Sequence, residues 1–189
     1  EKRKIYNKND NILQSVKYEM KLNRLPKFVE AFDISHLSGT MTVASMVCWK
    51  NNLPSKNDYR KYKIKGYKGN DDFASMKEVL TRRYKHINEE GLKIPDLILI
   101  DGGKGQTNIA AKVLTELGII KKVDLIGLAK GRSKRKKSSK TKFLIDYEYV
   151  VKPNQKNEIT LRRNSDVLHF LQKIRDESHR FAIDFHRSL

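Results

Sequence analysis

The stretch PDLILID, residues 95–101, is the part of the sequence that decides the fold. It is an almost unbroken apolar run of strand length, which is typical of a strand buried on both faces of a sheet. The segment GGKGQ follows at once and turns the chain into a helix expected at about residues 105–117, which Gly118 ends. A second buried strand, VDLIGLA at 123–129, comes next. Together these segments predict a strand–helix–strand unit.

Upstream of that unit the apolar residues follow two different periods. Three segments are rich in β-forming residues and are joined by short loops: FVEAFDIS, which begins at Phe28, TMTVASMVCWK at 40–50 and YRKYKIKG at 59–66. They predict an antiparallel meander of three strands. From Asp71 onward the pattern changes to helical spacing, with these residues on one face: Phe73, Met76, Leu80, Tyr84 and Ile87.

The remaining segments lie before the meander and after the second buried strand. Residues 1–26 are polar and lysine-rich, and they predict a linker or a peripheral helix. After the second buried strand, KGRSKRKKSSKTK at 130–142 has eight basic residues and predicts a loop. FLIDYEYVV and NEITLRR are expected to form a hairpin around Pro153 and Asn154, and a last helix is expected to begin at Asn164 or Ser165.

The predicted order of elements limits how the strands can be arranged. Right-handed crossover connections place the strand 95–101 beside the strand that begins at Phe28, and the strand 123–129 outside it. The result is an α/β fold with a mixed five-stranded sheet flanked by helices on both faces.

The charge of the chain indicates a polyanionic partner. The 189 residues include 40 Lys and Arg against 22 Asp and Glu, which gives a formal net charge of +18. Such an excess favours nucleic acid through Coulomb attraction and counterion release, although a membrane surface is also anionic and a basic surface can serve solubility alone. A basic run is usually a solvated loop, but with this net charge the run at 134–142 is equally a candidate for contact with DNA phosphates.

The cysteine count and the hydropathy indicate the compartment. The single cysteine, Cys48, excludes an internal disulfide and a cysteine-rich zinc site, and it suits a reducing cytosol. No apolar run is long enough to span a membrane, and the N-terminus lacks the apolar stretch of a signal peptide. A cytoplasmic protein without membrane contact is expected. Because the chain starts without Met and in the middle of a pattern, we expect it to be a fragment of a longer protein.

Two aspartates stand in apolar strands, where an ionised carboxylate is costly unless a positive charge compensates it. Asp33 lies within Ala-Phe-Asp-Ile-Ser, and Asp101 ends Leu-Ile-Leu-Ile-Asp. The predicted strand order makes these strands neighbours, so the two carboxylates are expected to meet and to bind Mg²⁺ or Mn²⁺ between them. Such a metal can activate water for attack on a phosphate. The alternative for Asp101 is a turn residue before Gly102.

Further groups can complete such a site. His179, on the last helix, can orient or deprotonate the attacking water or ligate the metal, although a lone helical histidine is more often structural. Asp176 or Glu177 can hold this histidine or add a ligand. Asp72 is either a third carboxylate or an ordinary residue of a helix N-terminus. Five basic residues are candidate phosphate contacts: Arg82, Arg83, Lys104, Lys130 and Arg132.

Three functions are compatible with these residues. The first is a metal-dependent endonuclease, and the second is a non-catalytic DNA-binding module that positions a nuclease elsewhere. The third, a nucleotide-binding enzyme that uses GGKGQ, has weak support, because the segment lacks the spacing of a phosphate loop and the Ser or Thr after Lys104.

Three long motifs carry a resemblance to a known family. The motifs are DISH from Asp33, IDGGKGQ from Ile100 and RDESHRFA from Arg175. Their residues and their order resemble those of the UvrC family, the incision subunits of bacterial nucleotide excision repair. With flanking segments, the resemblance covers roughly residues 28–187. It implies a ribonuclease H-like fold for residues 27–189, in agreement with the strand order.

The resemblance also implies an activity. It implies a metal-dependent cut on the 5′ side of a lesion in double-stranded DNA, with family roles for Asp33, Asp101 and His179. A further family aspartate falls on Asp72, although one residue is inserted after Gly69, and this insertion weakens the match. The expected partners are damaged DNA and UvrB, with UvrA upstream, through parts of the longer protein outside this chain.

Overall fold

The computed structural model describes residues 2–37, 41–65, 71–87, 89–132 and 146–187. Four helices, eight strands and two short 3-10 turns, η1 (Lys56–Asp58) and η2 (Ile120–Lys122), alternate along these residues. The helices are α1 (Lys2–Glu19), α2 (Asp72–Tyr84), α3 (Lys104–Glu116) and α4 (Asp166–Arg187). The strands are β1 (Phe28–Leu37), β2 (Met41–Lys50), β3 (Leu53–Pro54), β4 (Arg60–Lys63), β5 (Leu97–Asp101), β6 (Asp124–Arg132), β7 (Asp146–Val151) and β8 (Ile159–Thr160).

The strands of the described segments form one mixed sheet in the order β3-β2-β1-β5-β6-β7-β8, with β4 also paired to β2. As predicted, β5 lies parallel to β1, and β6 lies parallel to β5 on its outer side. The predicted number of five strands is too low. The hairpin β7–β8 extends the sheet because β7 pairs antiparallel with β6, and the loop with Pro54 contributes the short strand β3.

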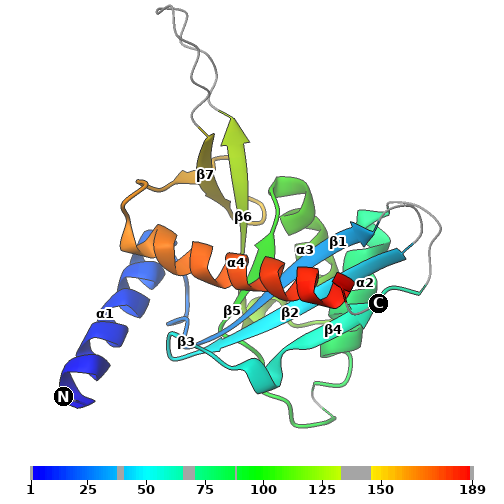
Figure 1. Ribbon diagram of the computed structural model, residues 1–189, viewed down its shortest axis with the longest axis horizontal. Coiled ribbons are helices and arrows are strands. Elements are labelled where there is room, and N and C mark those ends of the chain that lie inside the picture. Colours follow the sequence, from blue (N-terminus) through cyan, green and yellow to red (C-terminus); the bar gives the residue numbers. More distant parts are fainter. Residues whose placement is uncertain (1, 38–40, 66–70, 88, 133–145, 188–189) are drawn as a thin grey trace, which may run out of the picture.

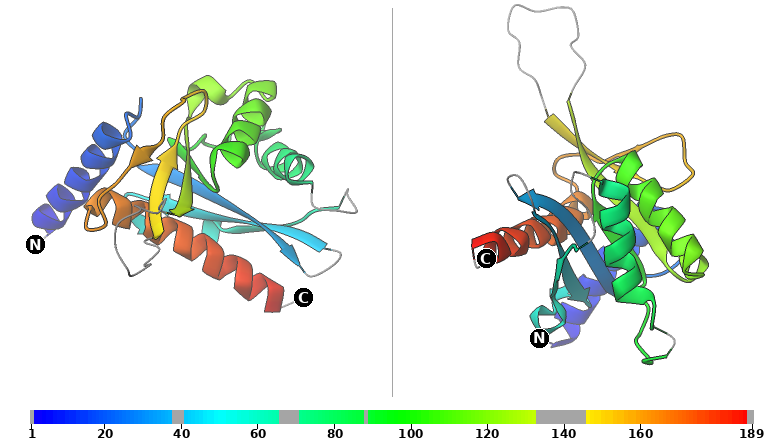
Figure 2. Two further views of the ribbon diagram at one scale, coloured as in Figure 1. Left: turned by 90° about the horizontal axis from the view of Figure 1, so that it is seen from above. Right: turned by 90° about the vertical axis from the view of Figure 1, so that its right-hand side faces the viewer.

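The sheet is the middle of three layers (Figures 1 and 2). Helix α4 crosses one face, together with the end of α1, and α2 and α3 cover the other face. Along β5 the alternation is plain, because Leu97 and Leu99 enter the core on the α4 side while Ile98 and Ile100 enter the core on the α2–α3 side. A strand with apolar side chains on both faces is therefore the centre of the fold, as PDLILID predicts.

The N-terminal segment packs on the α4 side of the sheet. Leu13, Val16 and Met20 are buried in the same core cluster as α4. The carboxylate of Asp124 accepts hydrogen bonds from the backbone N–H groups of Asn23 and Arg24, at 3.1 and 2.8 Å. The boundary at residue 26 stays a prediction. Among the described residues, no helix has the length and apolar character needed to span a bilayer.

A buried ionic cluster joins β1 to α2. The side chain of Glu30 is fully buried, and its carboxylate accepts hydrogen bonds from Arg83 Nη2 at 2.6 Å and from Tyr84 Oη at 2.5 Å. Burial, together with the neighbouring Glu30, raises the pKa of Tyr84 well above its ordinary value, so the hydroxyl stays protonated and donates. A charge inside an apolar strand is thus compensated by an arginine and a tyrosine.

Replacing Glu30 with alanine is expected to destabilise the fold by about 3–5 kcal/mol, because the partly buried guanidinium of Arg83 and the buried hydroxyl of Tyr84 lose their partner. Urea unfolding followed by circular dichroism measures this loss. The matched control is Glu89→Ala, which removes an exposed partner of His86 and is expected to change the midpoint little. Equal effects of the two substitutions would contradict a stabilising role for the buried pair.

Candidate active site

Asp33 projects from β1 toward α4. Val29 and Ala31 enter the core on the α4 side, and the alternation of the strand places Asp33 on that same face. The residue is only 6% exposed. The hydroxyl of Ser35 lies 3.4 Å from Asp33 Oδ2. A carboxylate is therefore held almost out of solvent at the sheet surface beneath α4.

Asp101 is the last residue of β5 and lies next to Asp33. Phe32 pairs with Ile100 in the parallel β1–β5 ladder, so the two aspartates follow at the same end of neighbouring strands. Burial first, and then the charge of Asp33, raise the pKa of Asp101 from 3.8 to about 6, against the opposing pull of nearby cationic groups. Both causes disfavour a second negative charge beside Asp33 unless a cation compensates it.

His179 reaches the two aspartates from α4. Its Nδ1 lies 3.3 Å from Asp33 Oδ2, while its side chain is 61% exposed. The preceding residue, Ser178, is buried against Ser45 of β2, whose hydroxyl donates to the carbonyl oxygen of Ser178 at 3.0 Å. Ser45 is also the ladder partner of Asp33, so this small polar contact sets the distance between α4 and the aspartate strand.

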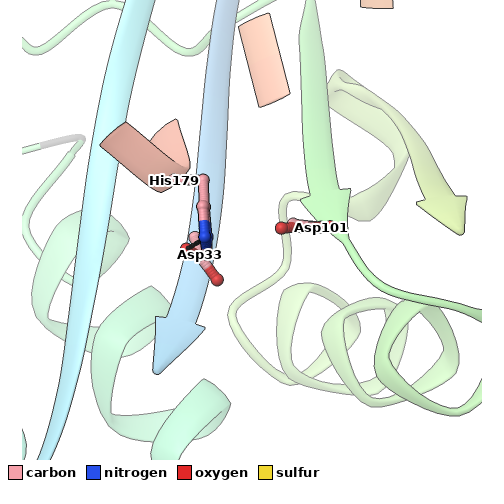
Figure 3. Close-up of side chains that lie close together, drawn as sticks. All are labelled: Asp33, Asp101 and His179. Atoms are coloured by element: carbon pink, nitrogen blue, oxygen red, sulfur yellow. Dashed lines mark hydrogen bonds and ion pairs between the residues drawn. The ribbon is translucent and has the colours of Figure 1, made fainter. Parts of the chain in front are cut away.

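The three groups form a candidate metal centre (Figure 3). One ligand atom each from Asp33, Asp101 and His179 lies within 4.8 Å of the other two. Two carboxylate oxygens are the hard ligands that Mg²⁺ and Mn²⁺ prefer, and a divalent cation would compensate the ionised form of Asp101, whose pKa is raised by burial and then by the charge of Asp33. The residues therefore fit the metal that the two aspartates predict.

Metal binding is expected to depend on pH through Asp101. The carboxyl must lose its proton to bind a cation, and with a pKa of about 6 it is largely protonated at pH 5 and largely ionised at pH 7. From this group alone, Mn²⁺ is expected to bind about tenfold more weakly at pH 5 than at pH 7. Calorimetric titration with Mn²⁺ at both pH values measures the ratio, and equal affinities would contradict a metal-ligating Asp101 with a raised pKa.

A hollow of about 470 Å³ opens beside these groups. Asp101 and His179 lie in its wall with Lys130 of β6 and Tyr149 of β7. Arg175, from the same turn of α4, also lines it, and its guanidinium donates to Glu148 and to Asp176. The hollow thus combines acidic groups on one side with cationic groups, the mixture needed to hold a phosphate near a metal.

Asp72 is placed apart from this cluster, at the first residue of α2. Asp71 is the helix cap, because its side chain accepts from Ala74 N at 3.0 Å. One oxygen of Asp72 is hydrogen-bonded to His36 Nε2 at 2.8 Å, and the other accepts a hydrogen bond from Gln106 Nε2 at 2.7 Å. The carboxylate therefore links the DISH strand, α2 and the first turn of α3.

Glu177 lies near the site in sequence but binds elsewhere. It accepts a hydrogen bond from Tyr59 Oη at 3.2 Å and pairs with Arg180 at 2.7 Å. The hydrogen bonds from Arg180 hold the pKa of Glu177 below its usual value. Among the described residues it joins neither the metal group nor the hollow, and it ties α4 to the segment before β4.

The five predicted phosphate contacts are spread over the fold. Lys130 is exposed in the wall of the hollow, and Lys104 is exposed as the first residue of α3, directly after Gly103. Arg82 donates a hydrogen bond to the carbonyl oxygen of Lys63 and forms an ion pair with Glu78, and Arg83 forms an ion pair with Glu30. Arg132 ends β6, and its side chain lies outside the described residues, as do residues 133–145 of the basic run.

Sequence reasoning missed three residues around the site. Ser45 and Ser178 bring α4 close to the sheet, and Arg175 places a positive charge near Asp101. None of the three residues stands in an unusual sequence pattern by itself. A signal existed in the motif RDESH, since a serine on the apolar stripe of a helix marks a close approach to the surface that the helix covers. The partner on the sheet is visible only in three dimensions.

Comparisons with known proteins agree on one family. The model of the UvrC RNAse H endonuclease domain family matches residues 17–183. The UvrABC system protein C of Acidobacterium capsulatum is 47% identical over 93% of this chain, and that of Methanosphaera stadtmanae is 47% identical over 95%. The chain spans 25% and 29% of the length of these two relatives.

One similarity to a solved structure is distant. The crystal structure of the endonuclease V from Bacillus subtilis matches 94% of this chain and 93% of its own length, with 13% identity and a TM-score of 0.45.

Proposed function

The chain belongs to the family of UvrC RNase H endonuclease domains, and from this we propose that it hydrolyses one strand of damaged double-stranded DNA on the 5′ side of the lesion with Mg²⁺ or Mn²⁺. The observation that carries the proposal is the convergence of Asp33, Asp101 and His179, of which Asp101 and His179 also line the hollow. A purely structural aspartate pair would be expected to have its own cationic partner, as Glu30 has in Arg83.

The proposed roles follow from the contacts of each side chain. Asp33 and Asp101 hold the cation, which when bound lowers the pKa of water and stabilises charge on the phosphate under attack. His179 donates from Nδ1 to Asp33, which leaves Nε2 as a neutral acceptor for the proton of the attacking water. Nε2 makes no hydrogen bond with any described residue.

DNA binding is proposed to centre on the lysines next to the site. Lys130 lines the hollow and Lys104 follows its glycine rim, so both suit backbone phosphates on either side of the cut. The formal net charge of +18 adds a long-range attraction to DNA. Arg83 is left out of this proposal, because its guanidinium is held by Glu30.

Delivery of the damaged DNA is proposed to depend on other parts of a longer cytoplasmic protein and on its partners UvrB and UvrA. The chain spans 25% and 29% of the length of two relatives, and the family model matches residues 17–183. We therefore expect weaker DNA binding by this chain than by a full-length relative.

A cleavage assay tests the proposal against its alternative, a non-catalytic DNA-binding module. Duplexes with one lesion inside a short unpaired bubble are incubated with Mg²⁺, with Mn²⁺ or with EDTA, and the cut is mapped on a sequencing gel. Cleavage 5′ to the lesion, lost in EDTA and restored by Mn²⁺, is expected. Tight binding without cleavage in either metal supports the binding module instead.

A further inference from the structure

A pair of tyrosines on β7 borders the proposed catalytic hollow. Tyr149 lies in the wall of that hollow, together with Asp101 and His179. Tyr147 stands two residues earlier on the same face of the strand, and the two ring centroids lie 5.8 Å apart with planes inclined at 42°. The rings therefore form one aromatic surface that begins at the hollow and leads away from it.

The strand β6 is shaped to hold these rings across its surface. Ala129 pairs with Tyr149 in the β6–β7 ladder, and Gly131 pairs with Tyr147. A Cβ at Gly131 would lie 2.5 Å from Cζ of Tyr147, and a Cβ at Gly103 would lie 3.6 Å from Tyr149 Oη. Small residues opposite both tyrosines thus let the rings lie across β6 toward the glycine turn that follows Asp101.

The pair contributes little to the core. Both residues are partly exposed, and neither belongs to the two buried clusters on the faces of the sheet. Within the described residues, Tyr147 has one side-chain hydrogen bond, to Glu158 at 3.4 Å, and Tyr149 has none. Packing therefore does not account for two adjacent aromatic residues at this position.

The surroundings indicate what such a surface binds. Lys130 lies between Ala129 and Gly131 on β6, and its exposed side chain borders the same hollow. Lys130 pairs with Glu148 across the β6–β7 ladder, so strand alternation turns it to the face opposite the tyrosine rings, and the hollow that Lys130 and Tyr149 both line is where the two groups come together. A ring and a lysine that border one hollow suit an unpaired nucleotide, because its base stacks on the ring while its phosphate meets the cation. A base inside a duplex is already stacked on both faces by its neighbours, so the surface selects a strand that is locally opened.

We propose that Tyr147 and Tyr149 form a stacking platform for an unpaired nucleotide that flanks the scissile phosphate. The proposal rests on the proposed function, since it needs a DNA strand in the hollow. It adds a preference of this domain itself for opened DNA, beyond the metal-dependent cut. Stacking and phosphate contact together would hold the strand in register with Asp33 and Asp101.

The test compares DNA affinities in the inactive background Asp101→Asn. Fluorescence anisotropy measures the dissociation constants for a bubble duplex and for a fully paired duplex of the same sequence. Y147L and Y149L are each expected to lower the preference for the bubble by roughly 5- to 100-fold. Y147F and Y149F keep the rings and are expected to remain within about threefold of the parent. The matched control is Y18L, which removes a tyrosine that is 85% exposed on α1.

Each outcome bears on the proposal. An unchanged bubble preference in both leucine variants would overturn it, and so would equal losses in the leucine and phenylalanine variants, which would assign the effect to the hydroxyls. Cleavage by the chain with Asp101 intact is measured in parallel with Mn²⁺. If that cleavage is missing while the leucine variants still lose bubble preference, the nuclease proposal fails and the platform stands.

Discussion

Replacing Asp101 with asparagine is expected to lower strand cleavage by about 10³-fold or more, because the change removes a metal ligand and with it several kcal/mol of charge stabilisation. Asparagine has nearly the shape of aspartate, so the fold is expected to persist. Burial already disfavours the ionised form of Asp101, as its raised pKa of about 6 shows, and the neutral side chain suits the site without metal. Single-turnover cleavage of a labelled bubble duplex measures the rate.

DNA affinity separates this effect from a loss of binding. Removing a negative charge beside the phosphate is expected to leave the affinity of D101N for DNA equal or higher. The matched control is D184N, which makes the same change on the exposed part of α4, where Asp184 pairs with Arg180. If D101N and D184N cleave at the same rate, the assignment of the site is wrong.

Replacing His179 with alanine is expected to lower cleavage by about 10²- to 10⁴-fold, the usual contribution of a general base. Because His179 donates to Asp33 in the proposed mechanism and does not hold the cation, Mn²⁺ affinity is expected to stay within about threefold. Cleavage rates and calorimetric Mn²⁺ titrations of the same preparation measure the two quantities. H169A, on the same helix at an exposed position, is the control.

A parallel loss of metal affinity in H179A would contradict the role of general base. It would assign His179 as a third ligand, which the distance of its ring to the two carboxylates also permits. The cleavage rate at saturating Mn²⁺ then distinguishes the cases, since loss of a base lowers this rate even when the metal is fully bound.

The sequence pattern predicted the centre of the fold because the central strands carry a simple signal. PDLILID is apolar on both faces, and its place between α2 and α3 forces a parallel pairing with β1. The edges of the sheet were harder to predict. Pairing of β7 with β6 depends on cross-strand contacts that join residues far apart in the sequence, so the five predicted strands became eight in the described part of the chain.

The same contrast holds for the site. Asp33 and Asp101 were identifiable because a carboxylate in an apolar strand needs an explanation, and His179 because its motif resembles that of a family. Glu30 carried the same signal as Asp33, yet its partner Arg83 was predicted to contact DNA. Sequence alone does not separate a buried ion pair from a metal ligand, since the difference is which group stands opposite in space.

Crystallographic localisation of Mn²⁺ is the most direct test of the metal centre. Crystals of the chain soaked in Mn²⁺ at pH 7 are expected to show one anomalous peak between the carboxylates of Asp33 and Asp101, and D101N crystals treated in the same way are expected to lack it. A peak absent from both, or present in both at the same height, would contradict the account that these two aspartates form the metal site of a nuclease.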